Sequence, residues 1–136
     1  MNKLEYIPGD LVIVKKSALQ FAKDKIFKVI SSLSGGFIKV VMLNDSSTTY
    51  SISNNAIRPI HLTTEILYKN GWKKSKINDC AYFYYKDGLF ITYTSKDGKF
   101  WFDDFDYSSS ICVYLPYVHS LQHILFCLGL NSEMDV

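Results

Sequence analysis

The sequence predicts an α+β protein: a small β-barrel at residues 1–62, and packed against it an α-β-β-β-β-α unit at residues 63–136. Short β-branched runs separated by turn residues fill the first half, which is typical of a small barrel. In the second half, two helix-like segments flank an aromatic run that two Lys-Asp-Gly tripeptides interrupt. A length of 136 residues with 48% hydrophobic content suits one folded domain or two very small ones.

The barrel is predicted from five runs of strand-forming residues. They are expected at residues 11–15, 26–30, 37–43, 48–52 and 57–60. Turn residues such as Pro8-Gly9-Asp10 and Ser34-Gly35-Gly36 separate them, and residues 53–56 predict one helical turn before the last strand. This arrangement resembles SH3, Tudor and KOW modules, so we expect an SH3-like barrel. The resemblance implies a shape and no particular partner.

The first element of the second half is predicted to be a short helix. Thr63 is a suitable N-cap, Glu65 lies in the first turn, and Asn70-Gly71 is a typical helix end. The densest basic cluster follows at Lys73, Lys74 and Lys76. Either these lysines protect a solvated edge strand, or they contact an anionic partner.

The two Lys-Asp-Gly tripeptides predict a three-stranded meander. Asp-Gly at the centre of a type I′ turn closes a two-residue hairpin loop. A loop at residues 87–88 places Tyr84 opposite Ile91, and a loop at residues 97–98 places Tyr93 opposite Phe102.

This register predicts two apolar sides for the sheet. One side collects Tyr82, Tyr84, Leu89, Ile91, Tyr93, Phe100 and Phe102, and the other collects Phe83, Tyr85, Phe90, Thr92, Thr94 and Trp101. The C-terminal helix is expected to cover the first side. Candidates to cover the second are the helix at residues 63–71, the barrel, a second copy of the chain in a homodimer, or a partner, with Tyr85 and Phe90 remaining accessible. Stacking of nucleic acid bases on this side is a further alternative.

The C-terminal region predicts a fourth strand at residues 111–115 and a helix at residues 117–128. The helix side expected to cover the sheet consists of Tyr117, Val118, Leu121, Ile124, Leu125 and Leu128. On the opposite side His119, His123 and Cys127 form a row at helical spacing, which is more typical of a solvated or interface position than of a metal site. The acidic residues Asp103, Asp104 and Asp106 lack the spacing of a calcium loop and predict a solvated turn. We therefore expect no metal or cofactor.

Charge and cysteine content narrow the function classes. The net charge is +2, with eight basic and four acidic side chains in residues 1–62 and seven and nine in residues 63–136. Arg58 is the single arginine, which disfavours guanine recognition in a major groove. Three distant cysteines predict buried, reduced thiols, and the apolar runs are far shorter than the roughly 20 residues of a membrane helix. We expect a cytoplasmic protein that does not enter a membrane.

Part of the sequence carries a recognisable pattern in "IRPIHLTTEILYKNGWKK" and "YVHSLQHILFCLGL". The matching positions are Ile57, Pro59, Ile60, Leu62, Thr63, Glu65, Leu67, Gly71, Trp72, Tyr117, Val118, His119, Leu121, Gln122 and Leu128. The pattern resembles a family of short uncharacterised proteins encoded by bacteriophages and prophages of gut bacteria. The resemblance implies a phage-derived accessory protein in a bacterial cytoplasm, and it implies no activity.

No arrangement of residues in the sequence predicts catalysis, so we expect a non-enzymatic protein that binds a host or phage protein. The candidate partner-binding residues are Tyr85, Phe90, Trp101, His119, Gln122 and Phe126. His119 and Gln122 are expected off the covering side of the helix, where they either cap a neighbouring loop or meet the partner. The alternative function is nucleic acid binding by the barrel lysines, Lys15 and Lys16 among them, together with Lys73, Lys74 and Lys76.

Overall fold

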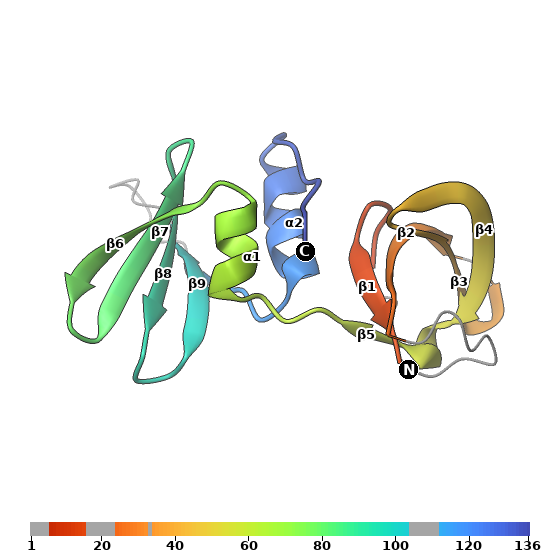
Figure 1. Ribbon diagram of the computed structural model, residues 1–136, viewed down its shortest axis with the longest axis horizontal. Coiled ribbons are helices and arrows are strands. Elements are labelled where there is room, and N and C mark those ends of the chain that lie inside the picture. Colours follow the sequence, from red (N-terminus) through yellow and green to blue (C-terminus); the bar gives the residue numbers. More distant parts are fainter. Residues whose placement is uncertain (1–5, 16–23, 33, 104–111) are drawn as a thin grey trace. The chain divides into compact units, whose positions relative to one another are not determined.

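The computed structural model describes residues 6–15, 24–32, 34–103 and 112–136. The chain divides into two compact units, Met1–Ile60 and His61–Val136. Each unit contains one five-stranded antiparallel sheet. Figure 1 shows the described elements of both units. In the described part of the chain, α2 (Val118–Cys127) is the only helix of more than six residues. The protein is therefore mostly β, and the expected α+β class is wrong.

The first unit is a sheet of five short strands. They are β1 (Leu11–Val14), β2 (Ile26–Ser32), β3 (Phe37–Met42), β4 (Asp45–Ser53) and β5 (Ile57–Pro59), with 3-10 turns at Ser34–Gly36 and Asn54–Ala56. Their order in the sheet is β4-β3-β2-β1-β5. All five strands lie where the sequence predicts them, within a few residues at each end.

The expected SH3-like barrel is not formed. In the described residues, β4 and β5 lie at the two ends of the strand order, and each is hydrogen-bonded on one side only. A barrel closes only when its first and last strands pair. Turn residues and β-branched runs set each strand locally, whereas closure depends on curvature accumulated over the whole sheet. Local sequence patterns do not determine that curvature.

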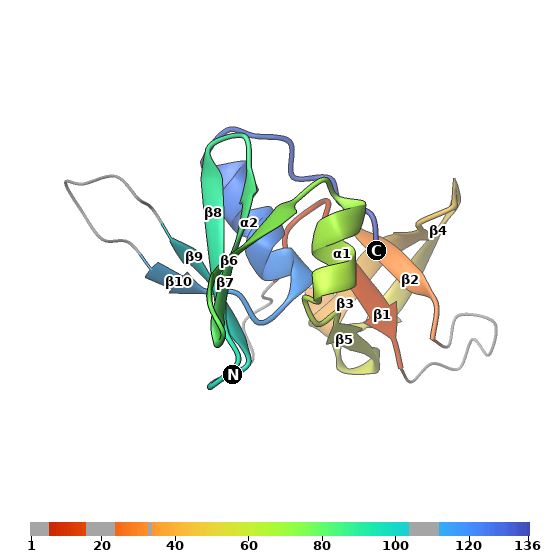
Figure 2. The same ribbon diagram turned by 60° about the vertical axis from the view of Figure 1, so that its left-hand side comes forward.

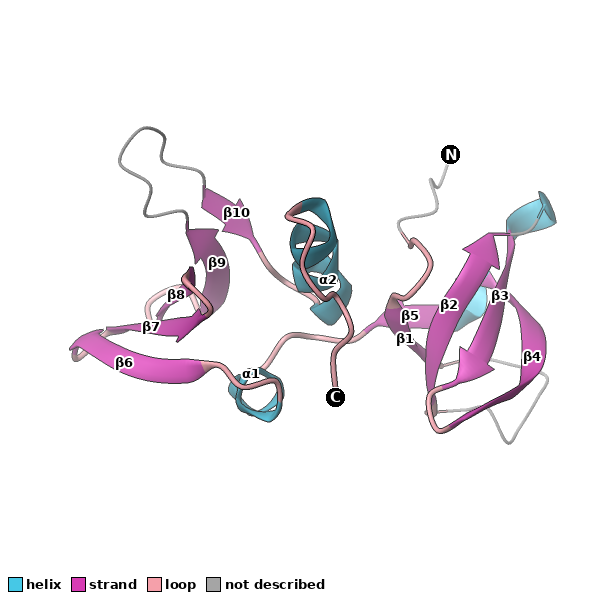
Figure 3. Ribbon diagram, turned by 90° about the horizontal axis from the view of Figure 1, so that it is seen from above, coloured by secondary structure: helices cyan, strands magenta, loops and turns pink. Residues whose placement is uncertain are grey.

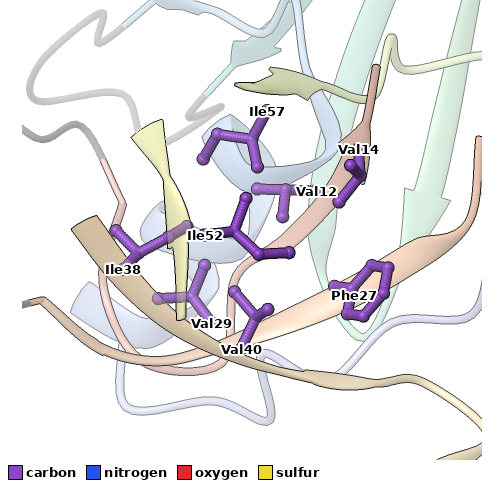
Figure 4. Packing of buried hydrophobic residues seen from close by; sticks show 8 residues of the cluster. All are labelled: Val12, Val14, Phe27, Val29, Ile38, Val40, Ile52 and Ile57. Atoms are coloured by element: carbon purple, nitrogen blue, oxygen red, sulfur yellow. The ribbon is translucent and has the colours of Figure 1, made fainter. Parts of the chain in front are cut away.

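The core of the first unit comes from alternating residues of the five strands. Its members are Val12, Val14, Phe27, Val29, Ile38, Val40, Ile52 and Ile57 (Figure 4). Alternation explains the spacing, because successive side chains of a strand point to opposite faces. The ring of Tyr50 meets Phe27 edge-on at a centroid distance of 6.0 Å.

The second unit is an antiparallel meander with two helices. Its elements are α1 (Thr64–Lys69), β6 (Lys73–Asn78), β7 (Ala81–Lys86), β8 (Leu89–Thr94), β9 (Lys99–Asp103), β10 (Cys112–Tyr114) and α2. The sheet order is β10-β9-β8-β7-β6. The sheet has one strand more than expected, because the lysine-rich segment after α1 pairs with β7.

The predicted ends of α1 are confirmed. The Thr63 hydroxyl accepts a hydrogen bond from the backbone amide of Ile66 at 3.3 Å. Gly71 follows the helix with φ of 85°, a left-handed conformation that favours glycine. The local sequence thus determines where this helix begins and ends.

The first predicted hairpin is also confirmed. Tyr84 pairs with Ile91 and Lys86 pairs with Leu89. Asp87 and Gly88 both have positive φ, at 51° and 80°, as a type I′ turn requires.

The second predicted hairpin has a different loop. Tyr93 pairs with Phe100 instead of Phe102, so the loop spans residues 95–98. The Asp97 carboxylate accepts hydrogen bonds from the Thr94 hydroxyl at 2.6 Å and from the backbone amide of Lys99 at 3.1 Å, which holds the longer loop. Because the pairing moves by two residues, every side chain keeps its predicted face.

One face of the second sheet is covered by both helices (Figures 1 and 3). On this helix-covered face Tyr84, Ile91, Phe100 and Phe102 are buried, as are Leu67 of α1 and Val118, Leu121 and Leu125 of α2. The expectation that the C-terminal helix covers this side is confirmed. Leu128 does not join the core, and its side chain is 50% exposed. The reason is that the helix ends at Cys127, one residue before it. Among the described residues no helix has the length and apolar character needed to cross a membrane.

Candidate functional site

The sheet side opposite the helices carries five aromatic side chains that are exposed or half-buried: Phe83, Tyr85, Phe90, Trp101 and Tyr114. Cross-strand pairing places its residues in two rows from β6 to β10. The first row is Lys73, Tyr85, Phe90, Asp103 and Cys112, and the second is Ser75, Phe83, Thr92, Trp101 and Tyr114. We call this side the aromatic face. Figure 2 shows β10, which completes it, beside β9 at the sheet edge.

The rings of the aromatic face form two groups. Phe83 contacts Tyr85 and Phe90, with centroid distances of 5.8 Å and 5.9 Å. Trp101 and Tyr114 are neighbours across β9 and β10 at 5.2 Å. Thr92 lies between the groups, since it pairs with Phe83 on one side and with Trp101 on the other. Thr92, which is smaller than the rings, thus separates the two aromatic groups.

The aromatic face remains accessible. Tyr85 is 38% exposed and Tyr114 is 42% exposed, while Phe83 and Trp101 are half-buried. By contrast, Tyr84 on the helix-covered face is 1% exposed. In Figures 1 and 3 no described helix of this unit lies on the aromatic side of the sheet. Within the described part of the unit neither helix covers this face, and its burial by a second copy of the chain stays a prediction.

Charged side chains border the aromatic face in nearly equal numbers. Lys73 stands at one edge, and the Lys99 ammonium lies 5.2 Å from the centroid of the Tyr114 ring. Asp103 and Asp97 supply the opposite charge. The pKa of Asp97 is lowered, chiefly because the Thr94 hydroxyl and then the Lys99 amide donate hydrogen bonds to its carboxylate. Such a balanced border does not favour a polyanion.

The three cysteines do not occupy the environment that the sequence predicted. Cys80, Cys112 and Cys127 are free, and all three are exposed, which corrects the expectation of buried thiols. Partial burial, and then the Asp103 carboxylate, raise the pKa of the Cys112 thiol. A raised pKa keeps this thiol protonated and weakly reactive at neutral pH.

The structure separates the six predicted partner-binding residues. Tyr85, Phe90 and Trp101 share the aromatic face, whereas Phe126 lies on α2 and is 62% exposed. The other two, on α2, are inside the unit.

His119 and Gln122 are buried, with 4% and 3% exposure. The Gln122 amide donates a 3.0 Å hydrogen bond to the carbonyl oxygen of Ser132, so Gln122 caps a neighbouring loop. Helical periodicity placed Gln122 off the covering side because it does not include the C-terminal segment, which meets this side chain at Ser132.

The three histidines belong to one row of rings. His61 contacts Tyr117 at 5.3 Å, Tyr117 stacks on His119 at 5.5 Å, and His119 meets His123 at 5.4 Å. Burial, and then the charge of His123, lower the pKa of His119 to about 4.

This row does not bring three potential metal ligands together around one point. The described residues contain no group of three histidine, cysteine or acidic side chains able to hold a metal ion. Of the acidic turn, Asp104 and Asp106 lie outside the described residues.

The predicted nucleic acid lysines do not form one patch. Lys73 lies on the aromatic face, while Lys74 and Lys76 are on the other side of β6. The Lys74 ammonium lies 4.0 Å from the Tyr82 ring centroid, and Lys76 forms a 2.9 Å ion pair with Asp79. In the first unit Lys15 pairs with Asp24 at 3.2 Å, and Lys16 lies outside the described residues.

Sequence reasoning missed Tyr114, Lys99 and Asp103 as members of the aromatic face. Strand alternation would have identified Lys99 and Asp103, because both are an even number of residues from Trp101 on the same strand. Tyr114 could not be placed in this way. Its partner on β9 depends on the path between β9 and β10, which local patterns do not determine.

The second unit has two hollows whose linings include titratable side chains. One, of about 120 Å³, is lined by Trp72, Lys86, Asp87, Glu133, Met134 and five further residues, none of which is a histidine, serine or cysteine. The other, of about 180 Å³, includes His61 and Lys99 and no carboxylate. Neither lining includes a serine or cysteine nucleophile.

No family model matches the chain, and comparison with curated proteins and with solved structures gave no match. The resemblance to phage proteins therefore stays a prediction, and the function is argued from the site alone.

Proposed function

We propose that this protein is a non-enzymatic binding protein that associates with another protein through the aromatic face. The observation that carries the proposal is the accessibility of Tyr85, Trp101 and Tyr114 on a sheet side that neither α1 nor α2 covers. Aromatic side chains are enriched in the centres of protein interfaces and contribute strongly to binding when they become buried there.

The charges beside this face favour a protein over a nucleic acid. Lys73 and Lys99 are balanced by Asp97 and Asp103. A phosphate backbone needs an excess of cations, because its affinity comes mainly from the release of counterions. In keeping with the resemblance, the protein acts as an accessory protein of phage or mobile-element origin in a bacterial cytoplasm.

The proposal is tested by site-specific photo-crosslinking in the cells that produce the protein. A benzophenone amino acid replaces Tyr85 on the aromatic face, and in a matched control it replaces Phe37 on β3, which is 44% exposed. We expect protein adducts from position 85 and none above background from position 37. Adducts at both positions or at neither would contradict a specific surface.

A second arm addresses the nucleic acid alternative. We expect the protein not to be retained on heparin or mixed-sequence DNA at low salt. Retention that weakens steeply as the salt concentration rises would indicate a phosphate binder and would overturn the proposed function.

A further inference from the structure

We propose that the occupant of the aromatic face is a second copy of this chain, bound face to face about a twofold axis parallel to the strands and centred on β8. This inference rests on the proposed function and names the partner of the same surface. In such an isologous dimer, each residue on one side of β8 faces a residue on the other side of β8 in the second copy.

The first row of the face is self-complementary in charge under this symmetry. Lys73 lies on β6, two strands from β8, and Asp103 lies on β9, one strand from β8 in the opposite direction. Strands are spaced by about 4.8 Å, so the two residues are roughly 14 Å apart in one chain and too distant to pair. Within the described residues neither takes part in an ion pair.

The twofold axis brings these charges together twice. It carries Lys73 of one copy over the β9–β10 edge of the other, one strand from Asp103. Packed sheets are separated by about 10 Å, and an offset of one strand adds little to the distance between the two residues. The long side chain of Lys73 can therefore reach toward the Asp103 carboxylate. The symmetry creates the same pair at the other edge. If both charges lay on the same side of β8, the symmetry would place each of them over the other side of the copy, and they would not pair across the interface.

The second row is complementary in size. Tyr114 and Ser75 lie two strands from β8 on opposite sides, and the axis places one over the other. Trp101 and Phe83 lie one strand from β8, so each aromatic ring meets a ring of the second copy. In this row only Thr92 lies on the axis, where it faces Thr92 of the second copy. Large side chains thus meet small ones at the edges, and aromatic pairs flank the centre, as in packed sheets with interdigitating side chains.

Charge reversal tests this arrangement. We expect sedimentation equilibrium to show reversible association to twice the 15.6 kDa of one chain. Lys73→Asp and Asp103→Lys should each raise the dissociation constant about tenfold or more, because each replaces two attractive pairs by two repulsive ones. The double variant should recover the affinity of the original chain.

Mixing the two single variants provides a sharper test. Their equimolar mixture should form a heterodimer with near-original affinity, since both of its cross-chain pairs are then attractive. Only a contact between residue 73 of one copy and residue 103 of the other predicts this result. As a matched control, Lys69→Asp on α1 reverses an exposed lysine away from the aromatic face and should leave the dissociation constant unchanged.

Three outcomes overturn the inference. They are a protein that stays monomeric up to millimolar concentration, a dimer unaffected by the two reversals, and single variants that do not rescue each other. Circular dichroism of each variant separates loss of association from loss of folding. If position 85 still crosslinks to a different protein in any of these cases, the proposed function stands. Failure of the dimer can therefore be distinguished from failure of the proposed function.

Discussion

The side-chain hydroxyls of Thr64 and Tyr84 lie 2.9 Å apart and join the first turn of α1 to the middle of β7. The Tyr84 side chain is 1% exposed, although its neighbour Tyr85 is 38% exposed. Two adjacent tyrosines thus have opposite environments, because successive residues of a strand face opposite sides of the sheet. This contrast separates the helix-covered face of the second sheet from the aromatic face.

Removal of the Tyr84 hydroxyl should destabilise the protein. We expect Tyr84→Phe to lower the free energy of unfolding by about 1 kcal/mol, the usual contribution of a hydrogen bond to stability. Urea denaturation measures the change. Tyr85→Phe is the matched control and should have no measurable effect, and equal losses in both variants would contradict the assigned faces.

The two faces of β8 should differ in their tolerance of truncation. Ile91 is fully buried on the helix-covered face, so Ile91→Ala should cost about 2–5 kcal/mol. Thr92 is half-buried on the aromatic face, and Thr92→Ala should cost less than about 1 kcal/mol. Chemical denaturation at low protein concentration, where association is negligible, tests both. A Thr92 loss as large as that of Ile91 would mean that the aromatic face is buried within the chain.

The two tryptophans should differ in access to a fluorescence quencher. Trp72 is 3% exposed, whereas Trp101 is half-buried on the aromatic face. At a dilution that keeps the protein monomeric, acrylamide should quench the Trp72→Phe variant, which retains Trp101, several times more strongly than the Trp101→Phe variant. Equal Stern–Volmer constants would show that Trp101 is as shielded as Trp72.

Stability should decline in mild acid because of His119. Its pKa is lowered from 6.5 to about 4 in the folded protein, chiefly by burial. Between these values the unfolded chain binds more protons than the folded one, so the free energy of unfolding falls as the pH decreases from about 6.5 to about 4. The full effect is about 3 kcal/mol at 1.36 kcal/mol per pKa unit.

Unfolding by urea at a series of pH values measures this slope. His119→Gln should flatten the curve over this range, although it can also lower stability at every pH. His61→Gln serves as the control because His61 is exposed, and it should preserve the slope. A slope unchanged by His119→Gln would assign the acid sensitivity to other groups.

Several features of the site could be predicted because they depend on neighbouring residues alone. Asp87-Gly88 requires the tight turn that sets the register of β7 and β8, and this register separates Tyr84 from Tyr85. Thr63 and Gly71 delimit α1 for the same reason. The membership of Tyr85, Phe90 and Trp101 in one face follows directly from alternation along the strands.

The second Lys-Asp-Gly shows where local information ends. It has the same three residues as the first, yet Asp97 is bonded to Thr94 and the loop is two residues longer. The residues before the tripeptide, and the pairing preferred by the whole strand, decide between the loops. The predicted assignment of side chains to the two faces is still correct, because the pairing shifted by an even number of residues.

What the sequence by itself determined was every described strand except β6, the limits of α1 and the division of the second sheet into two faces. Each depends on interactions across a few residues. Only the tertiary structure decided that β4 and β5 stay apart, that Tyr114 extends the aromatic face and that His119 and Gln122 are buried. These features depend on sheet curvature that accumulates over many residues, and on contacts between distant segments, such as Gln122 with Ser132. Many residues contribute to the free energy of such features, so no single short sequence pattern predicts them.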